Sequence, residues 1–190
     1  MKPFALALTL AVTIGAIGAH ASSLSLTLTP ASGAVGGAPG TAVGWGFTLT
    51  DTSNSDWIIL DDSFFTGSPV YGTYTDYIAN QFYVAGPSPE PATVVSPWNQ
   101  SAQTGTGEFD LYATDPSVSF SGTISVDYSL YSEDPNSPDF DPDSLISSGT
   151  FTDPVSISVT PEPPTWALMI LPFAALLAAF AKRSSPKHAS

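Results

Sequence analysis

Between residues 23 and 160 the chain alternates apolar and polar side chains with a period of two. The clearest run extends from Val118 to Leu130, where large apolar residues are interleaved with Ser, Thr and Asp. Strict alternation predicts strands that bury one face and expose the other to water, as in antiparallel sheets. No stretch of this region shows the 3.6-residue period of an amphipathic helix.

About eight such strands are predicted, separated by clusters of Gly, Pro, Asn and Asp, a pattern typical of an all-β, antiparallel β-sandwich. The expected strands lie at 24–29, 45–49, 57–60, 70–78, 81–85, 108–112, 118–130 and 155–159. Three stretches, 31–41, 86–91 and 133–144, are rich in turn residues and predict loops. None of them is long enough to separate two cores, so one folded domain is expected over residues 22–160.

The first 21 residues have the parts of a secretory signal peptide. Lys2 supplies a positive charge, residues 4–18 form an apolar and small-residue run, and Ala19-His20-Ala21 fits the small-x-small cleavage rule. We therefore expect the secretion translocon to export the chain and the signal helix (residues 1–21) to be removed after Ala21. The mature protein would then begin at Ser22.

The C-terminal residues predict a membrane anchor. Pro161-Glu162-Pro163 precedes an apolar run from Trp166 to Ala181, and Lys182 and Arg183 follow it. As a helix the run would span roughly 24 Å at about 1.5 Å per residue, slightly less than a hydrocarbon core of about 30 Å. It contains no charged side chain, whereas a helix of a soluble core should show a polar face. We therefore expect a transmembrane helix over 166–181, with the basic tail 182–190 in the cytoplasm.

The PEP tripeptide 161–163, the apolar span and the basic tail, together with a signal peptide at the other end, resemble the PEP-CTERM sorting signal of exported proteins in Gram-negative-type bacteria. The resemblance covers residues 161–190 and implies recognition by an exosortase, a membrane-embedded cysteine protease or transpeptidase. It further implies processing near 161–163 and transfer of the ectodomain to the cell surface or the exopolysaccharide matrix. Pro172 and the sparsely basic tail depart from the family pattern and affect the expected efficiency of processing.

The charges of the chain are segregated. The chain has 4 basic and 17 acidic residues, which give a net charge of −13, and the basic residues all lie at the ends. Residues 22–160 contain 16 of the acidic residues and no Lys, Arg, His or Cys. Phosphate contacts need cationic side chains, so this region excludes nucleic-acid binding, and it excludes catalysis by His, Cys or Lys. Its carboxylates repel one another, so we expect greater stability in added salt or at mildly acidic pH.

A non-enzymatic surface protein is the first interpretation, and a calcium-dependent glycan-binding module is the alternative. Asp139, Asp141 and Asp143 alternate in an acidic, proline-rich loop, in a pattern similar to the start of a calcium loop. Ser144 stands where an EF-hand has Gly and Thr150 where it has Glu, so no EF-hand is predicted. A solvated acidic turn is the competing interpretation of the same loop. No cofactor other than calcium is expected.

Sugar binding or hydrolysis would need side chains of two other kinds. Trp98 lies in a loop-like stretch and is expected to be the most exposed tryptophan, able to stack on a sugar ring. Glu108 and Asp110 would point to the same face of a strand, and a carboxylate pair is the minimum for a glycoside hydrolase, the remote alternative. Asp61 and Asp62 are expected to face opposite ways and are weaker candidates. The first interpretation assigns no catalytic residue.

Overall fold

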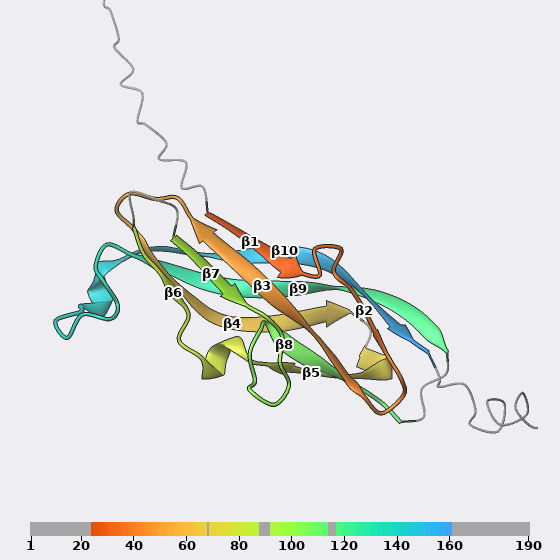
Figure 1. The fold of residues 1–190 in the computed structure, drawn as a ribbon. Helices are drawn as coiled ribbons and strands as arrows, with labels where there is room; N and C mark the ends of the chain where they lie inside the picture. Colours follow the sequence, from red (N-terminus) through yellow and green to blue (C-terminus); the bar gives the residue numbers. More distant parts are fainter. Residues whose placement is uncertain (1–23, 68, 88–91, 114–116, 161–190) are drawn as a thin grey trace, which may run out of the picture.

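The alternating stretches form the strands of two β-sheets that pack face to face (Figure 1). The computed structural model describes residues 24–67, 69–87, 92–113 and 117–160. No helix among these residues is long and apolar enough to cross a membrane. The expected signal helix (1–21) and transmembrane helix (166–181) lie outside the described residues.

The first sheet is arranged around β3 (Ala42–Asp51). Along one side β3 pairs with β1 (Leu24–Thr29); along the other it pairs in succession with β8 (Gly107–Leu111) and β7 (Ala92–Ser96). β5 (Gly72–Asp76) pairs with β8 and lies at the edge of the sheet. All these pairings are antiparallel, as the alternation of apolar and polar residues predicts.

The second sheet is built on a long hairpin. Its order is β2-β10-β9-β4-β6, with bounds β2 (Ala34–Gly37), β4 (Trp57–Gly67), β6 (Val84–Ala85), β9 (Val118–Tyr131) and β10 (Leu145–Val159). β9 and β10 pair along almost their whole lengths, and the acidic segment 132–144 connects them at one end. This segment is the loop at the far left of Figure 1. Short 3-10 helices occur at η1 (Pro69–Tyr71), η2 (Ile78–Asn80) and η3 (Pro142–Ser144).

The apolar faces of the two sheets meet in one core. Trp45 and Phe47 from β3 are fully buried against side chains of the second sheet that include Ile124 and Val126. Each large apolar side chain buried in this way stabilises the fold by roughly 1.5–3 kcal/mol. The buried indole N–H of Trp45 donates a hydrogen bond to the Gly33 carbonyl oxygen at 2.9 Å, so the polar atom of this ring is also satisfied.

Two strands lie where none was expected. β2 lies inside the Gly- and Pro-rich stretch 31–41, so the expectation of a loop there was wrong. It pairs in parallel with β10, whereas the other pairings between the described strands are antiparallel, as expected. Glycine permits this approach, because a Cβ at Gly36 would lie 2.4 Å from Ser158 Oγ. β7 was also missed, because its sequence, Ala-Thr-Val-Val-Ser, has two adjacent valines and shows no alternation.

Gly33→Ala is expected to destabilise the fold more than Gly40→Ala. Both glycines have positive φ, +65° and +76°, so alanine costs about 1–2 kcal/mol in backbone strain at either position. A Cβ at Gly33 would additionally lie 2.4 Å from the Pro154 carbonyl oxygen, whereas at Gly40 the nearest atoms, in Ala113, are 3.5 Å away. Denaturant unfolding of both variants measures the difference, and equal losses of stability would contradict this account.

Candidate functional site

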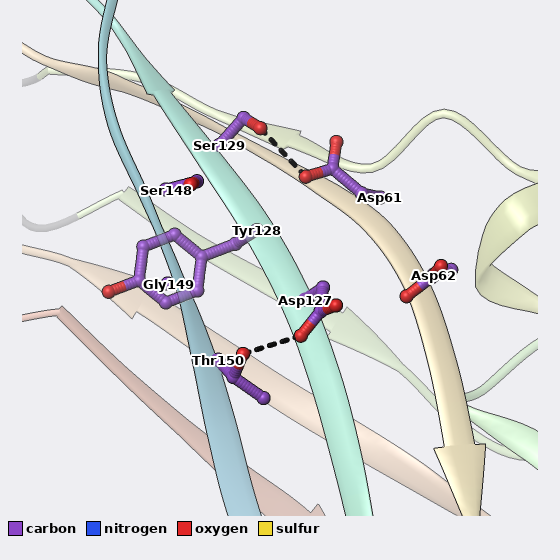
Figure 2. Close-up of a pocket in the computed structure, with 8 residues that line it drawn as sticks. All are labelled: Asp61, Asp62, Asp127, Tyr128, Ser129, Ser148, Gly149 and Thr150. Carbon is purple, nitrogen blue, oxygen red and sulfur yellow. Dashed lines mark hydrogen bonds between the residues drawn. The ribbon is translucent and has the colours of Figure 1, made fainter.

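A polar hollow of about 540 Å³ lies across β4, β9 and β10 of the second sheet (Figure 2). The described residues that line it are Asp61, Asp62, Asp127, Tyr128, Ser129, Ser148, Gly149 and Thr150. Val126 points into the core, so its neighbour Asp127 points away from the first sheet, because successive side chains of a strand face opposite sides. The carboxylates of the hollow therefore belong to the solvent face of the sandwich.

Asp61 and Asp62 both reach this solvent face because β4 carries a bulge. The pairing with β9 shifts between Leu60 and Asp62, so that Leu60 lies opposite Tyr128 and Asp62 opposite Asp127, with Asp61 as the additional residue. An additional residue in one strand changes the direction of the side chains beside it. The expectation that Asp61 and Asp62 face opposite ways was wrong, since both are exposed and both line the hollow.

Hydroxyl groups hold two of the three carboxylates. Ser129 Oγ donates to Asp61 Oδ2 at 2.7 Å, and Thr150 Oγ1 donates to Asp127 Oδ1 at 2.5 Å, as the dashed lines of Figure 2 show. Asp62 lies directly across from Asp127, and like charges in such a pair destabilise a sheet. Burial raises the pKa of Asp62 above its ordinary value, and the charges of Asp127, Asp76 and Asp61 raise it further.

The hollow gathers negative charge without forming a metal centre. Carboxylate and hydroxyl oxygens are the ligands that hard cations prefer. Within the described ranges, however, no group of three or more His, Cys, Asp or Glu side chains is placed to hold a metal ion. What the arrangement produces is a local negative potential that raises the concentration of cations over β4, β9 and β10.

The structure uses the acidic loop between β9 and β10 for local capping. Asp139, Asp141 and Asp143 are all exposed, and Asp141 Oδ1 accepts a hydrogen bond from the Asp143 amide at 2.9 Å as the N-cap of η3. Asp134 Oδ1 accepts from the Asn136 amide at 2.8 Å in the same manner. Such contacts are typical of a solvated turn. The three alternating aspartates therefore do not converge on one point, and calcium binding stays a prediction.

Glu108 and Asp110 do project from the same face of β8, opposite Gly44 and Ala42 of β3. Their surroundings differ, because Glu108 is only 9% exposed whereas Asp110 is exposed. Burial raises the pKa of Tyr77, and its hydrogen bond to the Glu108 carboxylate raises it further. Glu108 is thus covered by the protein rather than open to a substrate, which is not the geometry of a shared two-carboxylate site.

Trp98 is not the exposed platform that its loop-like sequence predicted. Its side chain is half-buried and packs on Gly44, where a Cβ would lie 2.1 Å from Trp98 Nε1. That indole nitrogen is buried and makes no hydrogen bond in the described structure. Because Gly44 has no side chain, the Trp98 ring fits against it. Gly44, directly before Trp45, is therefore the feature of the sequence that could have indicated a half-buried Trp98. The large aromatic side chains that are exposed instead are Phe64, Phe82 and Tyr112.

Comparisons with known proteins assign this chain neither a family nor a function. No family model matches the chain, and no curated protein matches it. A solved structure described as a crystal structure of a CaDoc0917–CaCohA2 complex at pH 5.5 is similar at a TM-score of 0.34 and 15% sequence identity, over 73% of this chain and 100% of that chain. A similarity of this size carries no argument about function.

The free energy of unfolding is expected to rise as the pH falls toward 4. Burial raises the pKa values of Asp62 and Asp153 above the ordinary 3.8, so the folded protein binds these protons more tightly than the unfolded chain does. Stability is therefore gained as the pH falls through the raised values and lost as it rises through them. Thermal melts between pH 4 and 8 at constant ionic strength measure this, and a melting temperature that increases steadily with pH would overturn it.

Asp62→Asn is expected to stabilise the domain at pH 7 by about 0.5 kcal/mol, because it removes one member of the opposed pair Asp62–Asp127. The gain should shrink in 1 M NaCl, where charges are screened within about 3 Å. Asp139→Asn is the matched control, since it removes the same charge from an exposed loop. Equal gains in the free energy of unfolding in the two variants would show that the effect comes from the net charge and not from the pair Asp62–Asp127.

Proposed function

We propose that this is an exported, non-enzymatic protein of the cell surface or exopolysaccharide matrix, sorted through its C-terminal segment. The observation that carries the proposal is the order of Pro161-Glu162-Pro163, the apolar run 166–181 and Lys182-Arg183, in a chain whose first 21 residues have the composition of a signal peptide. The partners are the secretion translocon and an exosortase-type membrane protease. The chain is anchored in the inner membrane until it is processed.

The distribution of cationic residues supports this route. Within about 15–20 residues of a membrane span, Lys and Arg are enriched on the cytoplasmic side, whereas long domains cross largely regardless of their charge. Residues 22–160 contain neither residue type, and Lys182 and Arg183 directly follow the apolar run. The charge pattern therefore favours an exported sandwich and a cytoplasmic tail.

The composition of the tripeptide region suits recognition by a protease. Three of the four residues 161–164 are proline, a composition that disfavours both a helix interior and a central strand, so we expect an extended backbone there. β10 ends at Val159, so the last strand of the sandwich stops directly before this segment in the sequence. A short apolar run also leaves the membrane more readily after processing than a long one.

The acidic loop and the residue that precedes the proposed sorting segment lie at opposite ends of β10. β10 extends from Leu145 to Val159, and 14 steps of about 3.3 Å give a separation of roughly 45 Å between its ends. The loop 132–144 precedes the first residue of this strand, and the sorting segment follows the last. On an anchored chain the acidic loop would thus lie at the end of β10 that is farther from the membrane.

Replacing Pro161-Glu162-Pro163 by three alanines is expected to leave the full-length chain in the membrane fraction and to abolish release of the ectodomain. The matched control replaces Asn136-Ser137-Pro138, in the exposed loop, by three alanines and should be processed normally. Immunoblots of membrane, surface and medium fractions, with a tag inserted after Ser22, distinguish the forms. Unchanged processing of the variant at 161–163 would refute the sorting proposal.

A further inference from the structure

A second hollow, of about 400 Å³, opens at the edge of the sandwich where the end of β4 in one sheet meets β5 in the other. This volume falls within the roughly 300–1,000 Å³ of sites that bind small ligands. The described residues that line it are Phe65, Thr66, Gly67, Gly72, Thr73, Tyr74, Phe109 and Tyr112. None of these residues belongs to the acidic hollow of Figure 2.

The aromatic rings of this second hollow are anchored in the core. Phe109 is 1% exposed, and Phe65 packs edge-on against it with the ring centres 5.0 Å apart. Tyr74 lies 6.4 Å from Phe65, with an angle of 32° between the ring planes. Tyr112, by contrast, is 46% exposed. The hollow thus has a rigid aromatic wall and one accessible ring at its rim.

Glycines let the two strands approach these rings closely. A Cβ at Gly72 would lie 2.3 Å from Phe109 Cε1, and one at Gly67 would lie 2.5 Å from the tip of the Phe65 ring. Any larger residue at either position would displace these rings and fill the entrance. The two glycines on the facing strands therefore keep the hollow open.

The lining combines aromatic rings with hydroxyl groups. Among the described lining residues there is no aliphatic and no charged side chain. Thr73 Oγ1 and Tyr112 Oη lie 3.4 Å apart at the rim, and Thr66 is exposed beside them. A sugar ring has the complementary surface: its C–H face packs on the electron-rich face of an aromatic ring, and its hydroxyl groups exchange hydrogen bonds with hydroxyl side chains. A pure hydrocarbon would offer these hydroxyl groups no hydrogen-bond partner.

The charge of the molecule limits the kind of glycan that this hollow can bind. All charged side chains of the described residues are acidic, so an anionic polymer is repelled from the surface. The hollow itself holds no carboxylate that would favour a cation. We propose that the hollow between β4 and β5 binds a neutral polysaccharide, with Tyr112 as the accessible stacking ring. This binding goes beyond sorting and needs neither calcium nor the loop that contains Asp139.

The test is isothermal titration of the full-length chain, purified in a mild detergent, with neutral hexasaccharides: cellohexaose, maltohexaose, xylohexaose and mannohexaose. We expect at least one of them to bind, Tyr112→Ala to weaken that binding by about tenfold or more, and Tyr112→Phe to retain most of it. Thr73→Val, which removes one rim hydroxyl at nearly constant shape, should weaken it severalfold. Phe82→Ala is the matched control, because Phe82 is 61% exposed and does not line the hollow.

Several results would overturn the proposal. They are binding of none of the four neutral sugars, unchanged affinity in both Tyr112→Ala and Thr73→Val, or binding only of hexagalacturonate, an acidic sugar used as a probe. Tyr112-dependent binding of an uncharged apolar peptide in place of the sugars would identify a peptide site and refute the glycan. Thr73→Val keeps the shape of the side chain. Comparing the affinity of this variant with that of the unaltered protein therefore tests the proposal even if Tyr112→Ala unfolds the protein. The sorting experiment at 161–163 needs no ligand, so the two proposals fail separately.

Discussion

The structure depends on one constraint: its carboxylates must be accommodated without any cationic partner. No described residue is Lys, Arg or His, so hydroxyl and amide groups take over that role. Asp51 accepts hydrogen bonds from the amide and hydroxyl of Ser53 at 2.7 and 3.0 Å, and Asp76 accepts from Ser63 Oγ at 2.5 Å and from the Ile78 amide at 2.8 Å. Hydrogen bonds to charged groups contribute about 1.5–3 kcal/mol each, more than neutral ones. The 40 Ser and Thr residues among the 139 of region 22–160 supply many such donors.

The same constraint shapes the surface. Where a hydroxyl is within reach, as for Asp61 and Asp127, the carboxylate is held on the solvent face. Asp153 illustrates the opposite case, because its Oδ2 is buried without a hydrogen-bond partner and burial raises its pKa. The result is a domain whose charged side chains, among the described residues, are all acidic, with an uncharged hollow at the edge between β4 and β5.

The local alternation of apolar and polar residues predicted the strands of the two sheets. Which residues meet at each hollow depended instead on how strands far apart in the sequence pair. The alternation along β9 correctly identified Ile124 and Val126 as core residues, because burial on one face of a strand is a property of neighbouring positions. Asp62 and Asp127 are 65 positions apart, and their juxtaposition depends on a bulge that has no signature in the sequence. Likewise the second hollow combines Phe65 with Tyr112 across two sheets. The expectations for residues 1–21 and 161–190 rest on the sequence and stay predictions.

The central claim is that this acidic sandwich is exported, cut at both ends and released from an anchor. Intact mass spectrometry of the protein recovered from the surface and matrix fractions tests it most directly. The account predicts a chain that begins at Ser22 and ends at or near Pro161-Glu162-Pro163. A recovered chain that still carries Met1, or that extends through Arg183, would contradict it.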